Sequence, residues 1–273
     1  MIPLNFDCNA KKKVIISVAP VSGPDPLIPE VLAEDVLKCV DAGASMCHLH
    51  CKTREGKLTP DITNISQAFD NILEKRDVIV QASTGGISDM TIQERCNPLQ
   101  YNRVESASLN GGSTNLGEAV YRNSFEDIRY CARVCYEKKI LPEIEVFDIG
   151  MIHNVEFIQK EMPFRKPMLF NLVFGHMGGM QPTVEALMAF RSFLPKDSFW
   201  GVTHFGRDNW NFLAAAISMG ALVVRIGFED SRYLEYGKDA KFNYEEIRKL
   251  ADLIRAMDFE PATVKEAREI LGL

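Results

Sequence analysis

Short apolar runs rich in β-branched residues alternate along this chain with longer stretches in which apolar residues recur at helical spacing. The short runs predict eight strands, at residues 14–19, 44–51, 77–83, 103–109, 143–147, 168–174, 199–203 and 221–228. The longer stretches predict helices over 29–42, 64–75, near 91, and over 125–138, 155–161, 183–193 and 211–219, with another from 243. A further helix is expected over 261–273.

Eight strand–helix units in 273 residues predict an α/β fold of the (β/α)8 TIM-barrel class. We expect one catalytic domain over 1–273 with an extra C-terminal helix, because no linker or shift in composition divides the chain. A doubly wound open sheet is the alternative. Such a sheet more often carries a Gly-x-Gly-x-x-Gly turn after its first strand, and this chain lacks one. Thr183, and Asn243 with Glu246 three residues later, match the patterns that begin helices.

Composition narrows the class of protein. The net charge of −6 argues against a general nucleic-acid binder, which usually carries a basic face. No apolar stretch is long enough to cross a membrane, and the first residues lack the charged start and apolar run of a signal peptide. The seven cysteines form no Cys-x-x-Cys pair, which favours reduced thiols in a cytoplasmic protein. Cys47 and Cys51 are expected to pack under a helix.

Two histidines two residues apart are the clearest chemical signal. His48 and His50 fall in a predicted strand, so both side chains point to the same face and could hold a divalent metal. On this spacing alone, two unrelated histidines are an equally good interpretation. Active sites of TIM barrels lie at the carboxyl ends of the strands, and the eighth predicted strand ends there with Arg225 and Glu229 on one face.

His48, His50 and Glu229 would together form the two-histidine, one-carboxylate set of many catalytic zinc sites. The alternatives are a surface carboxylate at Glu229 and a buried ion pair at Arg225. Asp230 could act as a general base that the charge of Arg225 keeps ionised and oriented, or it could be a turn residue. His176 and His204 are expected in loops at the catalytic end, where either could contact substrate, and His153 is expected to be exposed.

Several motifs, in order along nearly the whole chain, resemble those of one family, the β-keto acid cleavage enzymes. They are His48-Leu49-His50-Cys51-Lys52, Ser83-Thr84-Gly85-Gly86, residues 105–113 and 142–148, Gly178-Gly179-Met180, and Arg225-Ile226-Gly227-Phe228-Glu229-Asp230. The resemblance implies a (β/α)8 barrel, Zn²⁺ on His48, His50 and Glu229, and usually a homotetramer.

The resemblance also implies a reaction in which a β-keto acid and acetyl-CoA give acetoacetate and a new acyl-CoA. Asp230 would be the base, oriented by Arg225. The expected substrate-binding residues are Ser83, Thr84, Ser108, Asp25 and Glu143. Candidates for contact with the CoA phosphates are Lys11, Lys12, Lys13, Lys52, Arg54 and Arg207.

One departure from the family pattern concerns the substrate. Ser22-Gly23-Pro24-Asp25 stands where some members have Thr-Gly-Ala-Glu, whose acid helps to bind a cationic substrate tail. We therefore expect the chemistry to be retained and the substrate to differ. The main rival is a zinc-dependent hydrolase of the amidohydrolase type, which usually carries its His-x-His motif after the first strand rather than the second. A non-catalytic barrel that senses an acid metabolite is a second rival, disfavoured by Asp230 and Arg225.

Overall fold

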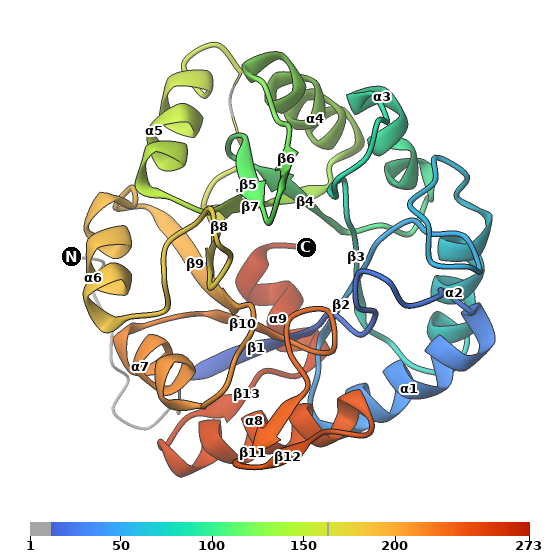
Figure 1. The fold of residues 1–273 in the computed structure, drawn as a ribbon, viewed down its shortest axis with the longest axis vertical. Helices are drawn as coiled ribbons and strands as arrows, with labels where there is room; N and C mark the ends of the chain where they lie inside the picture. Colours follow the sequence, from blue (N-terminus) through green and yellow to red (C-terminus); the bar gives the residue numbers. More distant parts are fainter. Residues whose placement is uncertain (1–11, 163) are drawn as a thin grey trace.

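Eight parallel strands close into a barrel in the computed structural model, which describes residues 12–162 and 164–273. The strands pair in the order β10-β9-β8-β7-β4-β3-β2-β1, and β10 pairs with β1 to complete the circle (Figure 1). Their bounds are β1 Lys13–Val18, β2 Met46–Leu49, β3 Ile79–Ala82, β4 Ser106–Asn110, β7 Leu141–Val146, β8 Met168–Phe174, β9 Ser198–His204 and β10 Val223–Ile226. The predicted TIM-barrel class is confirmed.

Within the described residues, eight helices surround the barrel and a ninth, α9, covers one end of it (Figure 1). They are α1 Pro29–Ala42, α2 Thr63–Leu73, α3 Ile92–Arg95, α4 Phe125–Lys138, α5 Ile149–Ile158, α6 Val184–Phe193, α7 Asn211–Met219, α8 Asn243–Ala256 and α9 Val264–Leu271. Helix α5 begins six residues before the predicted start of 155, because the Asp148 side chain caps it by accepting the Met151 N–H. None of the helices within the described residues is long and apolar enough to span a membrane.

The capping pattern predicted at Asn243 and Glu246 is wrong. The Glu245 carboxylate accepts the N–H groups of Lys241 and Phe242, at 2.7 and 3.0 Å. The Asn243 side chain is instead buried, where it accepts the Phe228 N–H and donates to the Pro20 carbonyl. Asn243 thus ties together the loops that follow β1 and β10, both of which lead to the candidate site.

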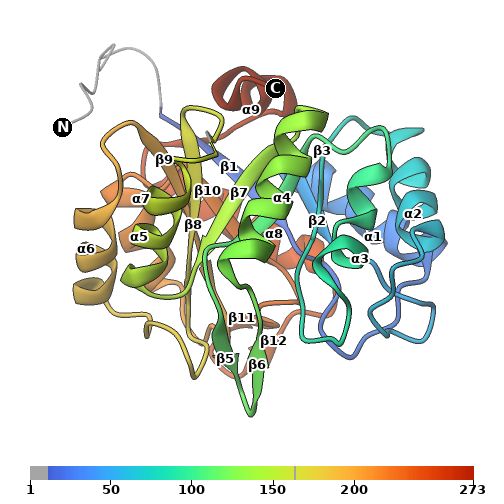
Figure 2. The ribbon, with the colours of Figure 1, turned by 90° about the horizontal axis from the view of Figure 1, so that it is seen from above.

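Short elements that the periodicity does not predict extend the two ends of the barrel. The pairs β5 (Thr114–Leu116) with β6 (Ala119–Tyr121), and β11 (Tyr233–Glu235) with β12 (Lys238–Asp239), are antiparallel hairpins. Figure 2 shows both hairpins at the end opposite to α9. Near α9, β13 (Glu260–Pro261) pairs with the start of β1, and η1 (Asn97–Gln100) is a single turn before β4. Elements of two to four residues are too short to show a hydrophobic period.

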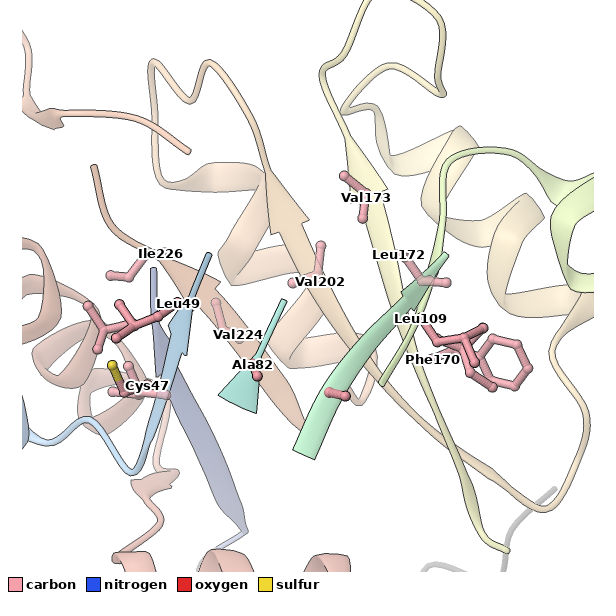
Figure 3. Close-up of a cluster of buried hydrophobic side chains, with 14 of the residues drawn as sticks. Cys47, Leu49, Ala82, Leu109, Phe170, Leu172, Val173, Val202, Val224 and Ile226 are labelled. Carbon is pink, nitrogen blue, oxygen red and sulfur yellow. The ribbon is translucent and has the colours of Figure 1, made fainter. Parts of the chain in front are cut away.

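Strand alternation divides the interior into two clusters. Outward side chains form the larger cluster together with side chains of the helices; Figure 3 shows Cys47, Leu49, Ala82 and Leu109 among its members, and Cys47 and Cys51 are buried as expected. Inward side chains near the amino ends of the strands form an apolar base layer, made of Ile15, Met46, Ile79, Leu141, Leu169 and Val223. Leu271 of α9 packs against this base layer and closes that end. The inward polar side chains therefore face only the other end.

Helix α9 should contribute substantially to stability through this contact. We expect Leu271→Ala to lower the free energy of unfolding by about 2–5 kcal/mol, because it leaves a cavity under a nearly fully buried side chain. Urea denaturation measures the change. Lys265→Ala, on the exposed face of the same helix, is the control and should change stability by no more than about 0.5 kcal/mol. Equal effects of the two variants would contradict the role given to α9.

Candidate metal centre and active site

The structure brings the three expected metal ligands together at the carboxyl end of the barrel. His48 lies on β2, His50 follows that strand, and Glu229 follows β10. The Nε2 atoms of His50 and His48 are 3.2 and 3.8 Å from the same Glu229 oxygen. One ligand atom from each of the three residues lies within 4.8 Å of the others. Closure of the barrel explains this, because β1 alone separates β2 from β10.

The hydrogen bonds of the two imidazoles prepare them to bind a cation. The Nδ1 atom of His48 lies 2.6 Å from the Gln81 amide oxygen, and that of His50 lies 3.2 Å from the Gly85 carbonyl. Both oxygens are acceptors, so Nδ1 is the donor in these two hydrogen bonds, and Nε2 is the atom of each ring that can bind a metal beside Glu229. The His48 Nε2 atom is buried and has no hydrogen-bond partner.

The charge state of these groups also fits a divalent metal. Burial lowers the pKa of His48 to about 3, so its ring is neutral near pH 7, as a metal ligand must be. Burial opposes ionisation of Glu229, but its neighbours His50 and Arg225 outweigh that effect and lower its pKa. Two imidazoles and one carboxylate suit Zn²⁺ and leave positions open for substrate.

Gln81 is a site residue that the sequence analysis missed. Its side chain is fully buried on β3, and its amide nitrogen donates to Glu143 at 2.5 Å and to Ser106 at 3.0 Å. These two acceptors fix the amide so that its oxygen faces His48. Strand alternation placed Gln81 on the same face as Ser83, and the β2–β3 register pairs it with His48. Only the register identifies the partner.

Arg225 joins the proposed base to the proposed metal ligands. Its guanidinium donates to both Asp230 oxygens, at 2.7 and 3.1 Å, and to Glu145 at 3.2 Å. It also lies 3.4 Å from Glu229. Burial disfavours its charge, but these carboxylates raise the pKa of Arg225 overall. Arg225 therefore stays cationic and holds Asp230 in a bidentate geometry.

Asp230 has the environment that a general base needs. Burial raises the pKa of Asp230 to about 6, although Arg225 opposes the shift. A base whose pKa is close to the working pH transfers protons efficiently. Asp230, His50, Arg225 and Glu229 line one cleft of about 550 Å³. The backbone here requires glycine, because a Cβ on Gly227, at φ +142°, would meet the Ala19 carbonyl at 2.3 Å.

The residues expected to bind substrate do not all lie in the same part of the site. The Ser83 and Ser108 hydroxyls are 3.3 Å apart and buried. Glu143 is also buried, and one of its oxygens has no partner. The Thr84 hydroxyl donates to the Ser108 carbonyl at 2.7 Å and lies near Cys131 of α4, so it holds strand ends together rather than facing the cleft. Asp25 lies at the rim, where Arg232 binds it at 2.9 Å.

The remaining three histidines lie in three different environments. His176 lines the cleft and stacks on Phe205, with ring centroids 4.0 Å apart. The expectation that His204 lies in a loop is wrong: it is the last residue of β9, and its ring packs on Phe212 of α7. Alternation sends His204 outward, since Thr203 before it points inward to Asn171. His153 is exposed as expected, with 81% of its side chain accessible.

Most candidates for phosphate contact are engaged elsewhere. Lys13 pairs with Glu266 beside α9, and Arg54 pairs with Glu30. Arg207 is buried against Glu246 at 3.0 Å and stacks on Trp210. Lys12 lies over the Phe259 ring, and Lys11 is outside the described residues. Lys52 lines the cleft, but carbonyl oxygens already surround its ammonium group.

Comparison with known proteins agrees with this geometry. A family model described as beta-keto acid cleavage enzyme matches residues 13–273. The chain is 36% identical over 254 residues to a 3-keto-5-aminohexanoate cleavage enzyme of Fusobacterium nucleatum, covering 91% of this chain and 92% of the relative. It is 28% identical over 300 residues to a 3,5-dioxohexanoate:acetyl-CoA acetone transferase of Paraburkholderia graminis, covering 96% of each.

A solved structure supports the fold independently. ObcA, in a ternary complex with a C4-CoA adduct and oxalate, superposes with a TM-score of 0.76 at 18% identity, over 91% of this chain and 67% of that chain. At this identity the similarity supports the barrel fold alone.

The site makes a direct prediction about metal content. Purified protein should carry about one zinc per chain, and His50→Ala should lose it, because two ligands no longer suffice to hold the ion. Elemental analysis after gel filtration measures the ratio. His153→Ala, at an exposed histidine, is the matched control and should keep its zinc. A zinc-loaded His50→Ala protein would show that the ligands are assigned incorrectly.

Gln81 should act on metal affinity through His48. We expect Gln81→Leu to weaken zinc binding by about 10–100-fold, because the His48 ring loses the acceptor that orients it. Competition with a chromophoric chelator gives the affinity. Gln67→Leu, the same change at an exposed position on α2, should leave the affinity unchanged. Equal zinc affinities of the two variants would remove Gln81 from the site.

Proposed function

The chain belongs to the β-keto acid cleavage enzyme family, and we propose that it converts a β-keto acid and acetyl-CoA into acetoacetate and a new acyl-CoA. The observation that carries the proposal is the shared cleft, in which Asp230 faces the His48–His50–Glu229 group and Arg225 bridges the two. The relative from Paraburkholderia graminis is named for an acetyl-CoA-dependent transfer, which supports the same co-substrate here.

His48, His50 and Glu229 would hold the ion. When bound there, Zn²⁺ supplies Lewis acidity that polarises the keto and carboxylate oxygens of a β-keto acid and acidifies the carbon between them. The protein's part is to present three ligands and leave the cleft side free for substrate. The buried lone pair of His48 supports this assignment, because a buried acceptor without a partner is costly.

Asp230 moves the proton in this proposal. Its carboxylate takes a proton from the carbon between the keto and carboxylate groups, while Arg225 holds both of its oxygens in place. The pKa of about 6 leaves Asp230 ionised near pH 7 and still basic enough to accept that proton.

The carbon skeleton is then exchanged in two balanced steps. The substrate carbanion attacks the acetyl carbonyl of acetyl-CoA, a carbon–carbon bond forms, and the CoA thiolate leaves. The thiolate attacks the original keto carbon, whose bond to the central carbon breaks, so the acyl group passes to CoA. The central carbon takes its proton back from Asp230, which releases acetoacetate and returns the carboxylate to its starting state.

Substitution of the base tests this assignment. We expect Asp230→Asn to keep its zinc and its fold but to lose at least about 100-fold in kcat, because the amide cannot accept the proton. Acetoacetate formation from a panel of β-keto acids with acetyl-CoA measures the rate. Asp239→Asn, at an exposed position on β12, is the control and should retain full activity.

Two results would overturn these assignments. An unchanged rate in Asp230→Asn would remove Asp230 as the base. Release of product by water, with no requirement for acetyl-CoA, would replace the acyl transfer by the hydrolase alternative.

A further inference from the structure

We propose that the tail of the β-keto acid accepted by this cleft is uncharged and apolar, as in a 3-oxo acid with a short alkyl chain. The inference rests on the function proposed above and concerns the part of the substrate that does not react. It is carried by the residues that line the cleft beyond the catalytic groups.

The wall of the cleft is mainly hydrophobic. Its apolar side chains come from five separate segments, namely Val21 after β1, Leu58 after β2, Ile87 after β3, Leu116 of β5 and Phe205 after β9. Ile87 and Phe205 remain 46% and 40% exposed. Apolar surface left open around a cleft gains free energy when an apolar ligand covers it.

No carboxylate in this wall is free to bind an ammonium group. The acidic residues lining the cleft are Glu229 and Asp230. Glu229 faces His50 and Arg225, and Asp230 is held by two bonds from Arg225. Asp25, at the rim, is bound to Arg232 at 2.9 Å. A cationic tail would therefore lose hydration without gaining a partner.

Lys52 adds a positive charge to the cleft, but its ammonium group has no N–H donor to spare. Its side chain is buried, and Nζ donates to the carbonyls of Ser22 at 2.6 Å, Gly23 at 2.9 Å and Asp25 at 3.4 Å. An ammonium group has three N–H donors, so all are in use. Carbonyl oxygens stabilise the charge without cancelling it, which repels a cation. With no donor left over, Lys52 is also a poor partner for a second carboxylate. Lys57, the other lysine that lines the cleft, is exposed, so water weakens its attraction for a carboxylate.

Three six-carbon acids separate the substrate classes. With zinc-loaded protein and acetyl-CoA, the substrates are 3-oxohexanoate, 3-keto-5-aminohexanoate and 3-oxoadipate, which add nothing, an ammonium group or a second carboxylate to one carbon skeleton. We expect kcat/KM for 3-oxohexanoate to exceed both others by at least about 10-fold, because the apolar wall cannot hydrate an added charge and the exposed Lys57 pairs with a carboxylate only weakly. Acetoacetate formation gives the rates.

Substitutions in the apolar wall of the cleft provide a second test of the substrate tail. Leu58→Asp should raise the ratio of kcat/KM for 3-keto-5-aminohexanoate over 3-oxohexanoate by at least about 10-fold, because it supplies the missing carboxylate. Leu58→Asn, nearly the same in shape but neutral, is the matched control and should not raise that ratio. Ile87→Asp, at a more exposed position of the same wall, makes the same prediction if the Leu58 variant does not fold.

The outcomes distinguish this inference from the function beneath it. Acetoacetate formed fastest from the ammonium or the dicarboxylate acid would leave the proposed reaction standing and overturn the apolar tail. Absence of acetyl-CoA-dependent acetoacetate from all three acids would overturn both. An unchanged substrate ratio in both the Leu58→Asp and the Ile87→Asp variants would show that the wall does not contact the tail.

Discussion

The positive charge of one side chain, Arg225, stabilises three carboxylates inside this barrel. Asp230, Glu145 and Glu229 all lie within 3.4 Å of it, and each would be costly to bury alone. Even so, burial raises the pKa of Glu145 to about 7, against the opposing charge of Arg225. The same ion pairs orient Asp230 and tie it to Glu229. The geometry of the proposed base and that of the proposed metal ligands therefore depend on one side chain.

The polar layer around Arg225 can exist because the layer below it is apolar and closed. The base layer, closed by Leu271 of α9, fills the end of the barrel at the amino ends of the strands, and the inward polar groups line the cleft at the carboxyl ends. In the polar layer, Glu143 and Ser106 hold the Gln81 side chain by hydrogen bonds, and Gln81 in turn orients the His48 ring. The apolar residues that stabilise the barrel and the polar residues of the candidate site thus lie in separate layers, which the strands connect.

The charges of the cleft are largely matched to one another. Arg225 binds Asp230, His50 faces Glu229, and carbonyls surround Lys52, so the loops offer a substrate tail mainly hydrophobic contact. In the function that we propose, reaction and tail recognition are carried by different residues. The groups proposed to react lie at the strand ends, whereas those proposed to discriminate lie in the loops at Leu58, Ile87 and Phe205. The homotetramer and the cytoplasmic location stay predictions from the sequence.

The amino-acid sequence was enough to predict the barrel and to name most residues of the candidate site. Hydrophobic periodicity revealed the eight strands, and two-residue alternation placed His48 with His50 and Arg225 with Glu229, because these patterns depend only on local backbone geometry. Register and neighbours depend on packing between distant segments. Tertiary structure therefore decided three contacts. Gln81 forms a hydrogen bond with His48, His204 packs on α7, and Arg232 forms an ion pair with Asp25. A shift of one residue along a strand reverses the face of its side chains, and the sequence carries no signal for which charges will pair across the barrel.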